Sequence, residues 1–168
     1  MNAGQSEFLR TAVPAAQACE RMWHVPASIT LAQAILESAW GQSKLARECN
    51  NYFGVKAAHD AAPNTYQDFL TTEFACGHRT SETAAFAKYA DVAVSFAAHA
   101  RLLAGAPRYQ PAMAAASNPE QFAQRLQACG YSTNPQYASD LMQLVRLYDL
   151  TQYDVEPEPP AKANELAA

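Results

Sequence analysis

One acidic side chain stands alone in an apolar, helix-forming stretch. Glu37 lies in the segment ILESAWG and follows Thr30 and Gln33 at helical spacing, which predicts one polar stripe on a helix. A carboxyl near a helix C-terminus among apolar neighbours has a raised pKa, because the helix dipole and poor solvation both disfavour its charged form. Such a group can protonate the departing oxygen of a glycoside. Spacing alone favours the simpler interpretation, a solvated residue on an outer helix face.

Other catalytic and metal-binding patterns are missing from the sequence. It contains no G-x-S-x-G, phosphate loop or HExxH motif. The four cysteines, Cys19, Cys49, Cys76 and Cys129, form no C-x-x-C pair, so no metal site and no cofactor is predicted. An even number of cysteines is compatible with disulfides outside the cytoplasm, and four buried or idle thiols are an equal alternative.

Composition indicates one helical domain with an unstructured end. The chain has 168 residues, of which 49% are hydrophobic and 17% charged. A net charge of −4 without a Lys/Arg cluster argues against nucleic-acid binding. No stretch approaches the roughly 20 apolar residues of a membrane span. The N-terminus lacks a Sec signal pattern, so we expect delivery by other means or excision from a longer protein.

Periodicity divides the first half of the chain into helices and a hairpin. Helices are predicted at about 6–23, where Pro14 should kink or split the helix, and at about 27–40, with Ser28 as a cap or first-turn residue and Gly41 as the end signal. Two alternating segments, DFLTTEF and ETAAFAKY, then flank the turn CGHRTS and predict a β-hairpin.

Helical signals resume at Asp91, a predicted N-cap. An S-x-x-E box at 117–120 opens a helix that Gly130 ends, and Asn134 with the following proline predicts the start of the last helix. The fold prediction is therefore mainly α (α+β), with a helical domain over residues 1–153 and a small inserted lobe of two or three strands. Residues 154–168 are rich in Pro, Glu and Ala and predict a disordered tail.

Four motifs in order resemble glycoside hydrolase family 73, the β-N-acetylglucosaminidases that cut bacterial peptidoglycan. They are ILESAWGQSKLA with NNYFGVK, TTEF at 71–74, FAKY at 86–89, and GYSTNPQYASDL at 130–141. The resemblance covers roughly residues 6–153 and is close to the C-terminal domain of flagellum-associated peptidoglycan hydrolases. It implies a lysozyme-like fold that cleaves the β-1,4 bond between N-acetylglucosamine and N-acetylmuramic acid as an endo-enzyme. Asn134 departs from the Asp expected there.

By position, the resemblance implies a catalytic role for three residues. Glu37 would be the general acid, and Glu73 a base or water-positioning residue, with Glu82 as a weaker alternative. Tyr131 and Tyr137 would line the cleft. Tyr131 is favoured as the residue that steadies the N-acetyl group or the attacking water, and ordinary packing is an equal alternative for both tyrosines.

The remaining expectations concern substrate and partners. Trp40, Asn51 and Phe53 are expected at the substrate site, the last two by shaping its floor. The substrate would be a peptidoglycan glycan strand, and the protein would act on it as a monomer in the periplasm or outside the cell. It would be a phage lysin or a secreted effector, and its delivery or immunity partner is not identified. The alternatives are a muramidase or lytic transglycosylase of the same fold, and a non-catalytic wall-binding module.

Overall fold

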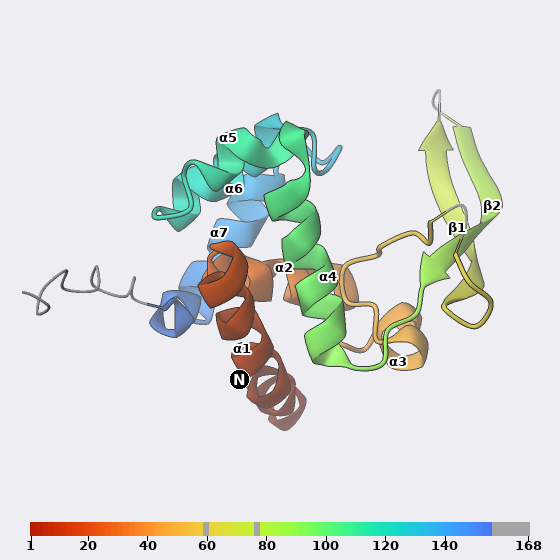
Figure 1. The fold of residues 1–168 in the computed structure, drawn as a ribbon, viewed down its shortest axis with the longest axis horizontal. Helices are drawn as coiled ribbons and strands as arrows, with labels where there is room; N and C mark the ends of the chain where they lie inside the picture. The colour runs from red at the N-terminus through yellow and green to blue at the C-terminus, as the bar shows by residue number, and fades with distance from the viewer. Residues whose placement is uncertain (59–60, 76–77, 156–168) are drawn as a thin grey trace, which may run out of the picture.

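The computed structural model describes residues 1–58, 61–75 and 78–155, with side chains except those of 71–82. Its helices form one body, and a hairpin projects from one side of it (Figure 1). In chain order, the elements are α1 Ala3–Trp23, α2 Ala27–Ser38, α3 Lys44–Cys49, β1 Tyr66–Ala75, β2 His78–Ala87, α4 Val92–Gly105, η1 Pro107–Tyr109, α5 Gln110–Met113, α6 Pro119–Ala128, α7 Tyr137–Leu147 and η2 Leu150–Tyr153. The predicted fold class, mainly helical with a small inserted hairpin, is confirmed.

The first helix is longer than predicted and is not split. Asn2 accepts a hydrogen bond from the Gln5 backbone N–H, while the Gln5 side chain accepts from the Asn2 N–H, and this capping box starts α1 at Ala3. The helix then runs through Pro14 to Trp23. The buried residues of α1, which include Phe8 and Leu9, pack towards α2 and α4, so tertiary contacts offset the hydrogen bond that a proline removes.

The second helix is almost completely buried. Ten of its twelve residues are buried, and it packs against α1, α7 and η2. Ser28 lies in the first turn of α2, which is one of the two positions predicted for it, and the N-cap position is Pro26, whose side chain has no acceptor. The helix ends at Ser38, two residues earlier than predicted. Ala39, Trp40 and Gly41 all have positive φ, at 49°, 60° and 73°, so three successive left-handed residues turn the chain away.

The hairpin is longer than predicted, and its turn is shorter. β1 pairs antiparallel with β2 from Tyr66 opposite Ala87 to Ala75 opposite His78. Most of the residues expected in the CGHRTS turn therefore lie on β2, because the ladder of backbone hydrogen bonds extends nearly to the end of the hairpin. A further bridge joins Lys56 to Phe86.

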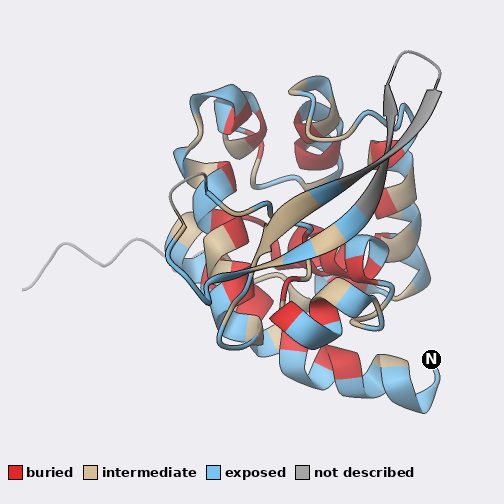
Figure 2. Ribbon diagram, turned by 90° about the vertical axis from the view of Figure 1, so that its right-hand side faces the viewer, coloured by how far each residue is buried: buried red, intermediate tan, exposed pale blue. Residues whose placement is uncertain are grey.

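Side chains fasten the hairpin to α3. The Gln67 amide donates to Glu48 (2.9 Å), and the Lys44 ammonium lies over the Phe69 ring, 5.4 Å from its centroid. None of the hairpin side chains that the structure describes is buried, whereas buried residues are concentrated in the helical body (Figure 2). The hairpin is thus anchored at its base, and those of its side chains that are described lie outside the main core.

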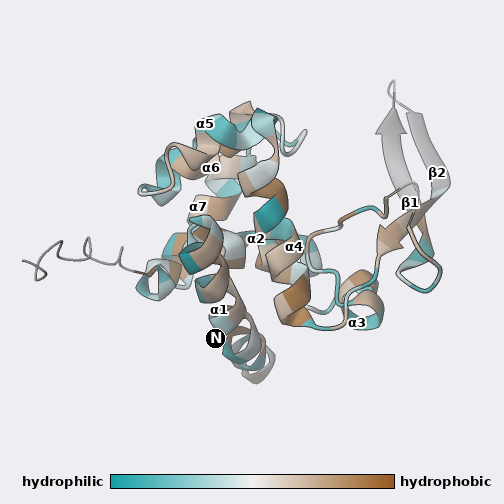
Figure 3. Cartoon of the chain, in the orientation of Figure 1, coloured by the Kyte–Doolittle hydropathy of each residue, from teal (hydrophilic) through white to brown (hydrophobic). Residues whose placement is uncertain are grey.

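The helices after the hairpin close the core. Asp91 caps α4 as predicted, by accepting from the Val94 N–H (2.9 Å). α4 is apolar along most of its length (Figure 3) and packs against α1. The cap of α6 is Asn118 rather than the predicted S-x-x-E box, and Gly130 has φ of 72° just after that helix.

The last helix begins later than predicted. Asn134 accepts from the Gln136 N–H in a local turn, and α7 starts only at Tyr137. Asp154 and Val155 then contact the helical body, so described contacts extend two residues past the predicted domain end. Residues 156–168 of the predicted tail lie outside the described residues, and that assignment stays a prediction. No helix in the described part of the chain is long and apolar enough to cross a membrane.

Candidate active site

Glu37 lies where the buried helix α2 reaches the surface. It occupies the last turn of the helix and is exposed, whereas the next residue, Ser38, is fully buried. The Ser38 hydroxyl accepts a hydrogen bond from the Gly41 N–H (2.7 Å) and thereby fixes the turn that follows. The tight turn leads the chain away directly after Glu37 and leaves this residue exposed at the surface.

The environment of Glu37 favours the protonated form of its carboxyl. Desolvation raises its pKa above the ordinary value of 4.5, and the Tyr137 hydroxyl, as a hydrogen-bond donor, opposes that rise. The residue as a whole is exposed, but protein atoms surround much of the carboxyl, and their effect exceeds that of the hydrogen bond. A carboxylic acid that keeps its proton to higher pH is suited to general acid catalysis.

Two predicted tyrosines lie together beside this acid. The Tyr131 and Tyr137 rings are stacked, with centroids 5.4 Å apart, and Tyr109 lies 5.9 Å from Tyr131. Burial raises the pKa of both Tyr131 and Tyr137, so their hydroxyls stay neutral and can donate hydrogen bonds. Although the resemblance favours Tyr131, it is the Tyr137 hydroxyl that lowers the pKa of the Glu37 carboxyl as a hydrogen-bond donor. A catalytic part for Tyr131 stays a prediction.

Trp40 packs into the helical body. Its ring makes edge contacts with Phe8 and Tyr148, with centroids 5.6 Å and 4.7 Å apart. These partners come from α1 and from the residue after α7, so the indole helps to hold the chain that leaves α2. Since the ring remains partly exposed, its predicted contact with substrate is still open to test.

Asn51 and Phe53 lie beneath the surface. Asn51 is 1% exposed, and its amide donates to the backbone oxygens of Val55 (2.8 Å) and Ala87 (2.9 Å), which ties the loop to the end of β2. Phe53 is 6% exposed and stacks on the His99 ring, 3.9 Å between centroids. This burial leaves little surface for direct contact with a sugar, and the part of both residues in shaping the floor of the site stays a prediction.

The second predicted carboxylate lies on the hairpin. Glu73 is on β1 opposite Thr80, and its side chain lies outside the described residues, as does that of Glu82. The structure therefore brings Glu37 and the tyrosines together, while the part played by Glu73 stays a prediction.

The cysteines that the structure describes are free thiols. Cys19 and Cys49 are buried and Cys129 is partly buried, while Cys76 lies outside the described residues. Within the described part of the chain, no group of three or more His, Cys, Asp or Glu residues could hold a metal ion.

Sequence reasoning did not identify His99 as part of this site, and it placed Gln33 on an outer polar stripe. Gln33 is fully buried, and its amide donates to the Tyr137 hydroxyl (2.9 Å). His99 Nε2 lies 3.0 Å from the Gln33 amide oxygen. The available signal was the i, i+4 spacing of Gln33 and Glu37, which places both on one side of α2. Nothing in the local sequence links His99 to them.

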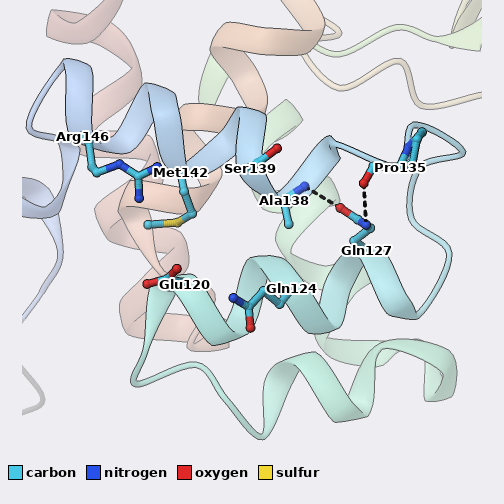
Figure 4. A pocket seen from close by; sticks show the side chains of 8 residues that line it. All are labelled: Glu120, Gln124, Gln127, Pro135, Ala138, Ser139, Met142 and Arg146. Atoms are coloured by element: carbon cyan, nitrogen blue, oxygen red, sulfur yellow. Dashed lines mark hydrogen bonds between the residues drawn. The ribbon is translucent and has the colours of Figure 1, made fainter.

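A separate pocket lies between α6 and α7 (Figure 4). It has a volume of about 300 Å³ and includes Glu120 and Arg146 in its lining. The Gln127 side chain fixes one wall by bonding to the backbone of Pro135 and Ala138. None of the residues predicted for catalysis or substrate binding lines this pocket, so Glu120 provides a control for Glu37.

Comparison with known proteins identifies the family. Residues 13–150 match the glucosaminidase family, described as mannosyl-glycoprotein endo-beta-N-acetylglucosaminidase. The chain is 39% identical over 152 residues to peptidoglycan hydrolase FlgJ of Pseudomonas aeruginosa, covering 87% of this chain and 37% of that protein. It is 38% identical over 169 residues to exo-glucosaminidase LytG of Bacillus subtilis, covering 98% of this chain and 58% of that protein. The chain thus spans less than two thirds of these relatives.

Solved structures agree with this assignment. The catalytic domain of the autolysin Auto from Listeria monocytogenes superposes with a TM-score of 0.81 at 28% identity, covering 92% of this chain and 89% of that chain. A truncated glycoside hydrolase domain of FlgJ from Salmonella typhimurium gives a TM-score of 0.70 at 33% identity, covering 86% of this chain and 97% of that chain. The chain therefore belongs to the glucosaminidase family of glycoside hydrolases, family 73, as its motifs indicate.

Proposed function

We propose that this protein hydrolyses the β-1,4 bond between N-acetylglucosamine and N-acetylmuramic acid in peptidoglycan, with Glu37 as the general acid. The observation that carries the proposal is the carboxyl of the exposed residue Glu37, which desolvation keeps protonated to higher pH beside the Tyr137 hydroxyl. Family membership supports the class of reaction, and relatives named peptidoglycan hydrolase and exo-glucosaminidase support the substrate.

In this proposal, Glu37 supplies the proton that the reaction needs. The bond between the anomeric carbon and the glycosidic oxygen breaks, and the Glu37 proton passes to that oxygen. Water adds its hydroxyl to the anomeric carbon, and its remaining proton passes to a base, a role we propose for Glu73. As the Glu37 carboxylate forms, the Tyr137 hydroxyl stabilises it by donating a hydrogen bond. Tyr131 would steady the substrate's N-acetyl group or the attacking water.

The proposed substrate places the reaction at the cell wall, in the periplasm or outside the cell. We propose an endo-acting enzyme that cuts within glycan strands. An exo-enzyme would release small products from chain ends while the remaining polymer stays long. The size of the products at low conversion therefore distinguishes these two modes of action.

The products of digestion test the proposed bond. Purified peptidoglycan is digested, reduced with borohydride and analysed by mass spectrometry. Reduced N-acetylglucosamine ends are expected. Reduced muramic ends would instead identify a muramidase, anhydro-muramic ends a lytic transglycosylase, and the absence of new ends a binding module.

Matched variants test the proposed acid. Glu37→Gln is expected to lower kcat by about 10²- to 10⁴-fold, the usual contribution of a general acid. Glu120→Gln changes a carboxyl in the pocket between α6 and α7 and is expected to keep wild-type activity. Turnover near wild type in Glu37→Gln would remove Glu37 from the mechanism.

A further inference from the structure

A buried polar row crosses the helical body and ends at the candidate acid. It runs from His99 on α4 through Gln33 on α2 to Tyr137 on α7, and these residues are 1%, 0% and 2% exposed. His99 Nε2 lies 3.0 Å from the Gln33 amide oxygen, and the Gln33 amide nitrogen lies 2.9 Å from the Tyr137 hydroxyl. Buried polar groups are costly unless they are bonded, so these contacts fix one another.

The bonding pattern gives the row a direction. The Gln33 oxygen faces His99, so the hydrogen between them must lie on His99 Nε2. Burial lowers the pKa of His99 to about 3, so its ring is neutral and carries one N–H. The Gln33 amide N–H then donates to the Tyr137 oxygen.

Tyr137 consequently has its own proton free for Glu37. Its oxygen accepts from the Gln33 amide, 2.9 Å away. Because its oxygen already accepts a hydrogen bond from Gln33, the hydroxyl can use its own proton to donate, and donation to the Glu37 carboxyl accounts for the lowering effect of Tyr137 on the Glu37 pKa.

His99 is held rigidly at the inner end of the row. Its ring is parallel to the Phe53 ring within 6°, with centroids 3.9 Å apart, and meets Tyr131 edge-on at 5.9 Å. Among the described residues, His99 Nδ1 has no hydrogen-bond partner. A buried ring nitrogen without a hydrogen bond lowers the stability of the protein. The presence of His99 at this position is explained if its hydrogen bond to Gln33 has a role in the site.

We propose that Gln33 and His99 are positioning residues that orient the Tyr137 hydroxyl so that its proton points at the Glu37 carboxyl. The inference rests on the proposed function of Glu37 and deepens it. By fixing the donor, the row stabilises the Glu37 carboxylate and makes Glu37 a stronger acid than desolvation alone would allow. The other titratable groups beside this contact are Tyr131 and, next to it, Tyr109.

The pKa of Glu37, measured directly, tests the proposal. The carboxyl carbon is followed by ¹³C NMR in a pH titration, and its signal is identified by its loss in Glu37→Gln. The Glu37 pKa is expected to rise in Tyr137→Phe and, in the same direction, in Gln33→Met. Adding Gln33→Met to Tyr137→Phe should cause no further shift, because both changes remove one interaction. An unchanged Glu37 pKa in Gln33→Met would overturn the proposal.

Controls separate orientation from packing. Thr30→Val removes a different buried polar group of α2, a hydroxyl that bonds only to the Pro26 oxygen among the described residues, and should leave the Glu37 pKa at its wild-type value. If Gln33→Met does not fold, a pair of variants at His99 gives the same test. His99→Phe should raise the Glu37 pKa, while His99→Gln, whose amide can donate to Gln33, should restore it. Equal values in these two variants would contradict the proposal.

Kinetics provide an independent comparison. In Gln33→Met, kcat/KM is expected to fall about tenfold, as for loss of a hydrogen bond to a charged group, and its basic limb should move to higher pH. A limb at the wild-type position would count against the proposal. The NMR titration needs no turnover, so a failure of the proposed reaction and a failure of this inference are distinguishable.

Discussion

The N-terminus of α2 is capped by carboxylates from elsewhere in the chain. Asp154 accepts hydrogen bonds from the Ser28 backbone N–H (2.6 Å) and the Ser28 hydroxyl (2.9 Å). Glu20 accepts from the backbone N–H groups of Ala27 (3.2 Å) and Val155 (2.8 Å). Negative charge at a helix N-terminus is favourable, and these residues satisfy donors that Pro26 cannot. We therefore predict that Asp154→Ala destabilises the protein.

The contacts set the size of this effect. Ser28 is fully buried, so the variant leaves its N–H and O–H groups without an acceptor. Unsatisfied buried donors cost about 1–3 kcal/mol, and loss of a helix cap falls in a similar range. Desolvation raises the pKa of Asp154, so burying this carboxylate already offsets part of the stability that its hydrogen bonds to Ser28 contribute. We expect a loss of about 2 kcal/mol, which lowers Tm by about 4–8 °C in a domain of this size.

Thermal and urea unfolding of matched variants measure the predicted loss of stability. Asp154→Asn keeps one acceptor oxygen and should lose about half as much stability. Ser28→Ala removes only the hydroxyl, and the double variant with Asp154→Ala should be less destabilised than the sum of the single changes. A Tm of Asp154→Ala within about 1 °C of wild type would refute the capping interpretation.

Two further predictions concern the end of α2. Gly41→Ala should lower the free energy of unfolding by about 1–3 kcal/mol, since φ is 73° and a Cβ would lie 3.2 Å from Tyr52 and 3.3 Å from Phe8. Gly54→Ala, where φ is 63° and the space around the residue is open, should lower it less, as measured by urea unfolding. An equal loss in the two variants would show that crowding at Gly41 contributes nothing. Glu37 has a raised folded pKa, so its ionisation lowers stability: the penalty is absent below 4.5 and complete above the folded pKa. The stability of Glu37→Gln relative to wild type should therefore rise with pH across that window, and a fall would contradict the raised pKa.

The elements of the fold could largely be predicted from local patterns. Helical spacing, the Asp91 cap and the alternation around the hairpin each depend on neighbouring residues and were read correctly. Element ends were less predictable. α2 ends before Gly41 because two non-glycine residues, Ala39 and Trp40, also adopt left-handed conformations. Residues that carry a Cβ rarely adopt this conformation, so their identity does not predict it.

The polar stripe on α2 shows what periodicity cannot decide. Thr30 and Gln33 follow the spacing of a solvent-facing stripe, and both are fully buried, because α1, α7 and η2 surround the helix. Their polar groups bond inside the protein, and of the three residues of this stripe only Glu37 is exposed. The spacing of polar residues shows that they share one face of a helix, but it does not show whether solvent or other helices cover that face.

The sequence by itself determined the elements, the family motifs and Glu37 as the candidate acid. Tertiary structure alone decided which groups act on α2 and its acid. Gln33 meets Tyr137 across 104 positions and His99 across 66, and Ser28 meets Asp154 across 126. Such contacts depend on how packed helices bring side chains within hydrogen-bonding distance, and burial then makes each unsatisfied donor costly. The local spacing of residues predicts neither the packing of the helices nor the burial of these donors.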